Sequence, residues 1–440
     1  MSAVIALRRP AAASNQSTLW ADHPHLSPSP WACLNALRSQ GHVNLETLAM
    51  PTLRDEAWRF TDLAPLAKLS LQPARHAPLP SAADMAPFQL DEVATRLVFV
   101  DGVHSPELSG PAATAGGVLV ANLPAALAVQ AAAVEAYLGR HQPSGDDVFA
   151  AFNTAFLSDA AVILVPRNAV LDAPLHLLFI ATQAGVVSHP RCLLIAEPGS
   201  SLTLIEDHVS LQVDAYLRNT VCEIVLEEQA KLQHIRVQRD GAQAFHIANT
   251  SVTLGRASQY RSVSVDMGAQ LSRHQFDVVL SEGADCAVDG LAVVAGSQLA
   301  DTHSCIVHAQ PHGRSRQLHK CIADGTARAV FNGKVKVQPG AQQTDAAQMS
   351  RNLLLSTRAR IDTQPQLEIL ADDVKCTHGA TVGSLDSEEV FYLQSRGLSD
   401  STARDLLTYA FGAEIIARIP VASLRQQLQQ RMLAQTGGRP

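Results

Sequence analysis

Alternating apolar and polar positions dominate residues 159–383 and predict a core of β-strands. In Glu197 to Glu206, EPGSSLTLIE, turn-forming residues precede the small residue Ser200, and an alternating strand follows. The same cue recurs in later segments: 227–237, 254–265, 281–294, 325–337, 338–347 and 356–370. The small residues of the first four copies lie roughly 27 to 30 positions apart: Ser200, Ala230, Ala257 and Ala284.

A loose repeat of this kind favours the stacked coils of a β-helix. Each coil of a β-helix needs a tight corner with a small residue, and it buries its alternating side chains against the next coil. An antiparallel sandwich is the structural alternative, because strand periodicity does not separate the two architectures.

The segments before this core have apolar residues at helical spacing. Ala125 to Leu138 and Asp146 to Leu157 contain few β-branched residues and predict helices. We interpret Pro51 to Leu66 as a surface helix with two aromatic packing anchors. Residues 1 to about 30 are rich in Ala, Ser and Pro and predict a flexible arm. The sequence thus predicts a mainly helical N-terminal region, residues 1–158.

The last part of the chain, residues 384–440, also predicts helices. Asp386 and Glu389 form a start that resembles a capping box, and Gly397 occupies a position typical of a helix end. Ser399 is suited to cap the next helix. The apolar stripe of that helix consists of Ala403, Leu406, Leu407, Ala410, Phe411 and Ile415. Such a stripe either packs on the core or docks a partner.

Composition narrows the possible functions of the 440 residues. Only 17% are charged, below the usual quarter, which indicates that a broad sheet or partner proteins cover much of the surface. A net charge of -7 argues against nucleic acid as the main ligand. Because no window reaches the length of an apolar membrane span and no signal peptide is recognisable, we expect a cytoplasmic protein that does not bind membranes. The 7 scattered cysteines are expected to be thiols.

Familiar catalytic motifs are missing from the sequence. It has no phosphate-binding P-loop, no dinucleotide fingerprint, no nucleophile elbow and no zinc-protease motif. We therefore expect no nucleotide site on this chain.

The stretch DDVKCTHGATVG, Asp372 to Gly383, contains the most informative pair of metal ligands. On an extended strand, Cys376 and His378 point to the same face. A thiolate and an imidazole suit iron, zinc or copper, but a closed tetrahedral site takes four ligands. Either this pair is a buried thiol beside a hydrogen-bonded histidine, or another element completes the site.

A second group of ligands occupies DTHSCIVHAQPHGRSRQLHKC, which begins at Asp301. His303 with Cys305, and His319 with Cys321, would share strand faces. The spacing matches no zinc pattern, so solvent-facing or hydrogen-bonded histidines are the alternative to metal ligands. The sequence assigns no role to the four histidines of this group: His303, His308, His312 and His319.

The run from Ala329 to Ser399 closely resembles the C-terminal part of the SufB/SufD family of iron–sulfur cluster assembly proteins. The resemblance extends to FAAFNTAFLSDAAVILVPRNAVLDAPLHLLFIA (Phe149 to Ala181) and to EAWRFTDL near the N-terminus. The SufD branch is favoured by EAWRFTDL, by LVFVDGVHSPELS and by Gly379 after His378, where SufB proteins typically carry an acidic residue.

The resemblance implies a right-handed parallel β-helix between N- and C-terminal helical regions, and a non-enzymatic scaffold role. The β-helix would pair with SufB, and the C-terminal helices would bind the SufC ATPase through Leu406, Leu407 and Phe411. His378, with Cys376, would contribute to a transient iron or nascent cluster site shared with SufB. A homodimer is a possible assembly of the isolated chain.

Two other functions remain open from the sequence. One is a SufB-type sulfur-accepting subunit, in which a core cysteine such as Cys222 or Cys286 would accept persulfide. The other is a carbohydrate-active β-helix enzyme, which would need a secretion signal, an aromatic-lined groove and a carboxylate pair. With 5% aromatic residues and no signal, the sequence argues against the second.

Overall fold

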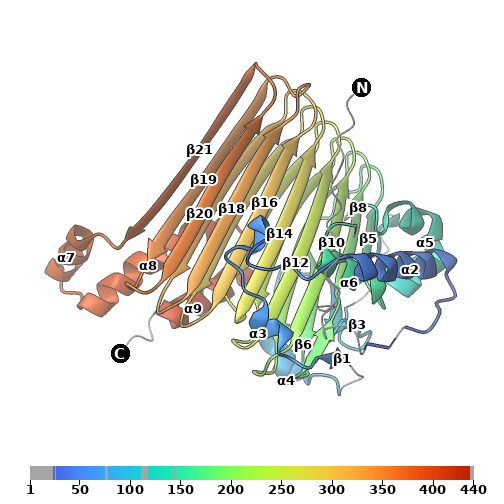
Figure 1. Cartoon of the computed structure of the whole chain (residues 1–440), viewed down its shortest axis with the longest axis horizontal. Helices are drawn as coiled ribbons and strands as arrows, with labels where there is room; N and C mark the ends of the chain where they lie inside the picture. Colours follow the sequence, from blue (N-terminus) through green and yellow to red (C-terminus); the bar gives the residue numbers. More distant parts are fainter. Residues whose placement is uncertain (1–22, 25, 75–77, 111–116, 142–144, 437–440) are drawn as a thin grey trace.

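The computed structural model describes residues 23–24, 26–74, 78–110, 117–141 and 145–436. Two facing sheets run through it (Figure 1). Sheet A contains β1 (Gln72–Pro73), β4 (Leu119–Asn122), β5 (Ala161–Val165), β7 (Val186–Ser188), β8 (Arg191–Ala196), β10 (Leu217–Leu226), β12 (Phe245–Leu254), β14 (Leu271–Leu280), β16 (Leu299–His308), β18 (Arg328–Val337) and β20 (Arg360–Ile369). Sheet B contains β2 (Thr95–Val100), β3 (Val103–His104), β6 (Leu175–Ala181), β9 (Ser201–Ser210), β11 (Lys231–Arg239), β13 (Gln259–Asp266), β15 (Asp285–Val294), β17 (Arg314–Ala323), β19 (Thr344–Leu354) and β21 (Val374–Ser384).

The chain alternates between the two sheets, and each strand pairs in parallel with the strand of the next coil. In sheet A, Cys192 pairs with Cys222, Cys222 with Thr250, and Thr250 with Phe276. Residues 161–384 thereby wind about 8 turns of a parallel β-solenoid. The predicted parallel β-helix is confirmed, and the parallel ladders exclude the antiparallel sandwich.

Small residues occupy the corners of the solenoid, and one of the four predicted corner positions is wrong. Ser200, Ala230 and Ala284 are buried at corners, each directly after a residue with positive φ. The fourth copy is displaced by one position: Ala257 adopts φ 55° and is exposed, and Ser258 takes the buried corner position. The Ser258 hydroxyl donates to the Gly255 carbonyl oxygen at 2.8 Å, so the small polar side chain closes the turn.

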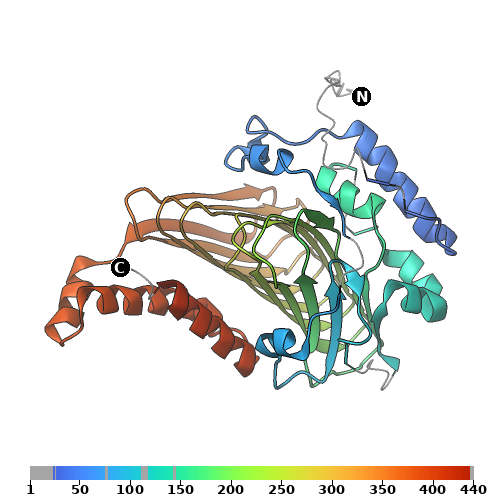
Figure 2. The ribbon, with the colours of Figure 1, turned by 90° about the horizontal axis from the view of Figure 1, so that it is seen from below.

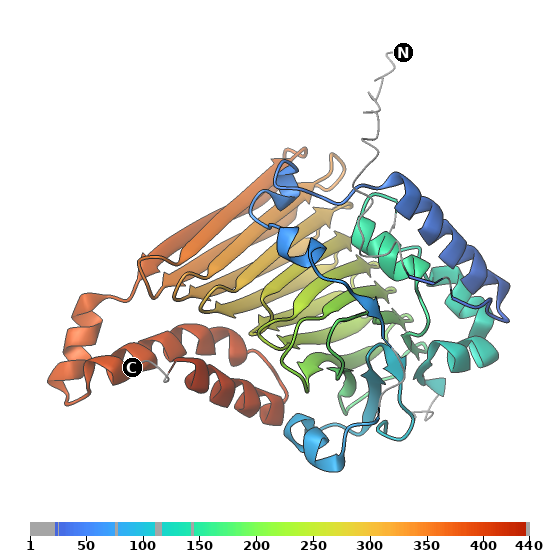
Figure 3. The same ribbon diagram turned by 60° about the horizontal axis from the view of Figure 1, so that its bottom comes forward.

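Helices cover the outer faces of the sheets, whereas the inner faces meet in a core shared by both sheets. The helices are α2 (Ala32–Thr47), η1 (Glu56–Trp58), α3 (Ala64–Ala67), α4 (Ala82–Met85), η2 (Ala86–Phe88), α5 (Leu123–Tyr137), α6 (Val148–Ala155), α7 (Ser387–Ser395), α8 (Asp400–Ile416) and α9 (Ala422–Thr436). Figures 2 and 3 show the N-terminal helices on sheet A and α8 and α9 along sheet B. As described, none of these helices is both long and apolar enough to span a bilayer.

The expected surface helix over Pro51 to Leu66 is wrong. This segment contains only the short η1 and α3, and Trp58 inserts between sheet A and α6. The indole stacks on Phe149 at 5.6 Å and lies under the guanidinium of Arg273 at 3.9 Å. Because one aromatic anchor and a cation–π contact hold the segment, no continuous amphipathic helix is needed to attach it. Most of the expected N-terminal arm lies outside the described residues.

The predicted caps Asp386, Gly397 and Ser399 of the C-terminal helices are confirmed, but Asp386 caps the amide of Glu388 and does not form the expected capping box with Glu389. The Asp386 carboxylate accepts from the amide of Glu388 at 2.8 Å at the start of α7. Ser399 accepts from the amide of Thr402 at 3.1 Å at the start of α8. Gly397, between the two helices, adopts φ 97°, which an L side chain rarely takes. Local sequence signals therefore fix both helix starts.

Candidate functional site

Strand β21 ends sheet B and carries both predicted metal ligands. Its pairing partner is β19, where Ala346 lies beside Cys376 and Gln348 beside His378. Ala346 and Gln348 are buried on the inner side of β19, so Cys376 and His378 continue the inward-facing row of the solenoid. The structure therefore brings the two ligands to one face, as the sequence predicts.

The two ligands differ in their surroundings. Cys376 is half-buried and packs with Val374 and Leu367 against an apolar cluster of the last coils. Burial raises the pKa of its thiol. His378 is exposed, whereas Gln348, its neighbour one coil earlier, is 2% exposed. His378 occupies an inward position that no further coil of the described chain covers.

The C-terminal end of the solenoid is open, as Figure 1 shows for β20 and β21. Each of these strands pairs on one side within the described chain, so the other edge presents backbone donors and acceptors. Apolar side chains are exposed there: Ile369 at 40%, Leu370 at 52% and Val382 at 46%. Solenoids normally cap such an end with a polar terminal repeat, whereas this end leaves strand edges and apolar side chains uncovered in the described chain.

The histidines of residues 301–321 do not converge on one site. His303 faces outward and contacts the Asp301 carboxylate at 2.9 Å. His308 faces inward, 2.9 Å from the Ser315 hydroxyl, and His319 stacks on Phe331 with ring centres 4.3 Å apart. His312 adopts φ 62° at a corner. The predicted face sharing is confirmed, but the two pairs lie in different sheets and on opposite faces.

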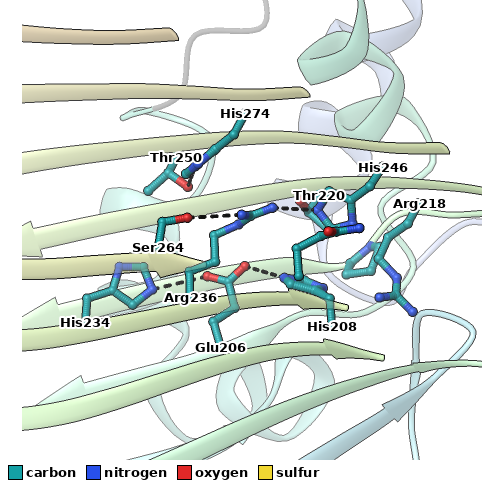
Figure 4. Close-up of polar contacts among 12 residues, drawn as sticks. Glu206, His208, Arg218, Thr220, His234, Arg236, His246, Thr250, Ser264 and His274 are labelled. Carbon is teal, nitrogen blue, oxygen red and sulfur yellow. Dashed lines mark hydrogen bonds and ion pairs between the residues drawn. The ribbon is translucent and has the colours of Figure 1, made fainter. Parts of the chain in front are cut away.

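A buried polar network fills part of the solenoid interior (Figure 4). Glu206 of β9 lies between two imidazoles: its carboxylate contacts His208 at 2.7 Å and His234 at 3.3 Å. The Nδ1 atom of His234 lies 2.8 Å from the Tyr260 hydroxyl. Burial lowers the pKa of His208, although the Glu206 carboxylate opposes this effect. The network therefore places a carboxylate among largely neutral hydrogen-bonding groups.

The adjoining part of the network centres on Asp240. Its carboxylate accepts from Tyr216 at 2.5 Å, forms an ion pair with Arg218 at 2.7 Å and contacts His246 Nδ1 at 2.8 Å. Arg236 donates to His246 Nε2 at 2.8 Å, so Nδ1 carries the imidazole proton and donates to Asp240. Burial lowers the pKa of His246 to about 3, consistent with a neutral imidazole.

Among the described residues, three potential metal ligands converge inside this network. One donor atom each of Glu206, Cys222 and His234 lies within 4.8 Å of the other two, and all three residues are buried. The sequence analysis missed this group. Its signal is the coil length: Glu206 and His234 are separated by 28 residues, which places them on the same face of adjacent coils. Cys222 comes from the opposite sheet, and no local motif predicts that contact.

Two family models together cover almost the whole chain. Residues 179–411 match the SufBD core domain of SUF-system iron–sulfur cluster assembly, and residues 18–177 match the SufBD N-terminal region. The chain belongs to the SufB/SufD family. The resemblance predicted from the sequence is therefore confirmed.

Three individual proteins are similar to this chain over most of their lengths. A SufBD family protein of Synechocystis is 41% identical over 91% of this chain and 90% of its own length. The iron–sulfur cluster assembly protein SufD of Escherichia coli is 32% identical over 90% of this chain and 92% of its own. The chloroplastic protein ABCI7 of Arabidopsis thaliana is 33% identical over 92% of this chain and 87% of its own. The family is one of assembly scaffolds, not known to be catalytic.

The C-terminal helices of this SufB/SufD chain present only part of the predicted stripe. Leu406 is 45% exposed, whereas Leu407 is half-buried. Phe411 packs against the apolar cluster of sheet B, and the Lys320 ammonium lies 4.3 Å from its ring centre. The residues of α8 that are buried are Ala403, Thr408, Gly412, Ile415 and Ile416. Leu406 is thus available to a partner, and Phe411 mainly attaches α8 to the solenoid.

Helix α7 adds exposed aromatic residues that the sequence analysis did not select. Phe391 is 71% exposed and Tyr392 is 57% exposed, whereas Val390 is buried. Two large aromatic side chains on the surface are unusual in a chain with 5% aromatic residues. Leu406 of α8 is exposed as well, and these three side chains are called the apolar surface of α7 and α8 below.

Proposed function

We propose that the chain is a SufD-type scaffold subunit that builds and transfers nascent iron–sulfur clusters together with a SufB subunit and the SufC ATPase. The open end of the solenoid carries this proposal, because it combines unpaired strand edges, exposed apolar side chains and an incomplete ligand set. The E. coli and Synechocystis relatives, described as SufD and as a SufBD family assembly protein, support it. We expect the complex to work in the cytoplasm, without a membrane or nucleic acid.

The partner strand would pair with β21 or β20 and continue the sheets across the interface. Backbone hydrogen bonds supply affinity in such strand additions, and the adjacent side chains supply specificity. Val382 and Ile369 would lose their exposure to water. His378 and Cys376 would then meet ligands from SufB, which turns two ligands into a complete site for iron or a nascent cluster.

A single substitution tests the role of His378. The His378→Ala variant should still co-purify with SufB and SufC, because an exposed side chain contributes little to the strand pairing. Loss of outer-shell partners alone lowers metal affinity by about 10 to 100-fold, so loss of a direct ligand should reduce retained iron by about tenfold or more. Iron content and cluster transfer to an acceptor protein are the measurements.

Thr377→Ala is the matched control, since Thr377 lies on the opposite face of the same strand. It should retain iron at the level of the unmodified complex. Normal iron content and cluster transfer in His378→Ala would show that this residue has no role in assembly. A complex that fails to form would show that the His378 side chain is needed for subunit association, contrary to the expected role in metal binding alone.

The apolar surface of α7 and α8 is the proposed SufC contact. Leu406→Asp should reduce co-purification with SufC at least tenfold, because a charge would be buried in an apolar interface. Leu433→Asp is the control: Leu433 is 48% exposed on α9, outside that surface. Equal recovery of SufC with both variants would refute the assignment. Leu407 and Phe411 are weaker test positions because both are partly buried within this chain.

A SufB-type sulfur-accepting role is the second candidate, because Cys222 and Cys286 lie in the solenoid core. The neighbouring Cys192 thiol and then burial raise the pKa of Cys222, and burial raises the pKa of Cys286. The thiolate is the nucleophile in sulfur transfer, so this environment disfavours persulfide formation. Labelling of either cysteine by a desulfurase would support the second candidate over the first.

A further inference from the structure

The group of Glu206, Cys222 and His234 lies well inside the solenoid, away from the open end. It combines a carboxylate oxygen, a thiol sulfur and an imidazole nitrogen, and each comes from a different strand: β9, β10 and β11. Strands are rigid supports, so their separation is set by the coil geometry and not by a mobile loop. The donor types are those that bind zinc and iron.

A fourth donor is adjacent to this group. Cys192 pairs in register with Cys222 on the neighbouring strand β8, and both side chains are buried in the inner core. The Cys192 sulfur lies outside the group of donor atoms that are within 4.8 Å of one another, and both thiols are free. With the Cys192 side chain turned toward the group, two sulfurs, one nitrogen and one oxygen would make a tetrahedral set for a divalent cation. The set is supplied by one chain, in contrast to the two ligands of β21.

Neighbouring residues orient the His234 imidazole and the Glu206 carboxylate, as the residues around the ligands of a metal site do. The Tyr260 hydroxyl lies 2.8 Å from His234 Nδ1, so it can hold Nδ1 protonated and leave Nε2 free to bind a cation. His208 contacts Oε1 of Glu206, and Oε2 is the oxygen that faces His234. His208 is itself fixed by stacking on Phe179 at 4.9 Å, and its buried Nδ1 has no hydrogen-bond partner.

Charge balance permits a divalent cation here. Two thiolates and one carboxylate would give the ligands three negative charges, which a divalent cation would reduce to one; Arg218 and Arg236 lie in the adjoining network, where they are paired with Asp240 and Asp266. Cation binding would replace the two thiol protons, which leave to solvent as the metal–sulfur bonds form.

We propose that Cys192, Cys222, Glu206 and His234 form an internal site for a divalent zinc or iron cation, with Tyr260 as a positioning residue. This site would link four successive strands across both sheets, because β8 and β10 belong to sheet A and β9 and β11 to sheet B. It is independent of the proposed role of Cys376 and His378 at the open end.

The test uses the full chain in a Cys376→Ser/His378→Ala background, so that the residues at the open end cannot bind the cation. Cells are grown with cobalt as the added metal, because tetrahedral cobalt with thiolate ligands absorbs strongly and visibly. We expect about one cobalt per purified chain, a thiolate charge-transfer band, and two sulfur neighbours by X-ray absorption spectroscopy. Cobalt at well below one per chain, or a shell without sulfur, would overturn the proposal. The metal content of protein purified from cells grown with added zinc shows whether the site also binds zinc.

Variants in the same background assign the ligands. Cys222→Ser should remove the charge-transfer band, and Tyr260→Phe should weaken retention by about 10 to 100-fold without changing the number of sulfur neighbours. Cys286→Ser is the control, because Cys286 is a buried core thiol outside the group. Unchanged cobalt in Cys222→Ser, or equal loss in Cys286→Ser, would refute the assignment. If Cys222→Ser does not fold, the X-ray absorption result on the parent chain decides.

Discussion

The centre of the solenoid and its C-terminal end contain the same ligand types in opposite settings. Cys222 and His234 are buried, and His234 is held by contacts with Tyr260 and Glu206 of this chain. Cys376 and His378 occupy the same kind of inward position, but His378 is exposed because the described chain provides no further coil. The two regions have the same types of ligand and the same strand periodicity. They differ in whether a further coil stacks on them, and this decides whether the inward-facing ligands are covered.

This difference shows which part of the solenoid stabilises the fold and which part is open to a partner. In the middle, neighbouring coils on both sides supply hydrogen-bond partners to buried groups such as Glu206 and Asp240, and the result is an internal polar network. At the end, the same row of side chains has a neighbour on one side only and is open to a partner. The comparison predicts large effects on stability in the centre and effects on assembly at the end.

The largest expected effect comes from breaking the central ion pair. Arg218→Ala leaves the Asp240 carboxylate buried with only neutral partners, which should lower the free energy of unfolding by about 3 to 5 kcal/mol. Denaturant unfolding followed by circular dichroism measures the change. Arg404→Ala is the control, because Arg404 pairs with Asp400 on the exposed surface of α8 at 2.8 Å, where a helical pair contributes about 0.5 kcal/mol or less. An equal loss in the free energy of unfolding for both variants would contradict the comparison.

The next effect is a loss of stability in mild acid. Burial lowers the pKa of His319 to about 4 and that of His246 to about 3, both below the ordinary value of 6.5. Folding therefore favours the neutral imidazoles, so their stabilisation is complete above pH 6.5 and is lost as the pH falls towards 4. Each such histidine should remove about 1.4 kcal/mol per pH unit within that window. Unfolding measured between pH 7 and pH 5 tests this slope.

A substitution of His319 separates its contribution. His319→Gln removes the titrating group that stacks on Phe331 and should reduce the pH slope by about one proton. Ser262→Ala, at another residue of the same internal cavity, carries no ionisable group and should leave the slope unchanged. A slope that His319→Gln does not alter would show that the imidazole is already charged in the folded chain.

The smallest effect concerns thiol reactivity and leaves the fold intact. Cys192, Cys222 and Cys321 are buried, whereas Cys376 is half-buried at the edge. An alkylating reagent should label Cys376 in the folded chain, faster at higher pH because burial raises the pKa of its thiol, and the buried thiols only after unfolding. Peptide mass spectrometry identifies the sites. Addition of SufB should protect Cys376, and labelling that SufB does not slow would place the partner elsewhere.

Strand periodicity and local caps made much of the fold predictable. Alternation after residue 160 predicted the strands, and small residues predicted most of the corners, although Ser258 and not Ala257 occupies the fourth. The segment around Trp58 was not predictable, because a half-buried indole stacked on Phe149 and contacts of Phe60 and Thr61 with the solenoid attach it, whereas its sequence resembles an amphipathic helix. Contacts between distant segments override local propensity there.

The ligand pair at the open end was visible in the sequence because a strand places every second residue on one face. By itself, the sequence determined that Cys376 and His378 share a face and that Asp386 and Ser399 begin helices, since these are local relations. Only the tertiary structure decided that Cys222 meets Glu206 and His234, because that contact depends on the coil length and on the stacking of two sheets. It also decided that His378 lies uncovered, since exposure depends on where the stacking of coils ends.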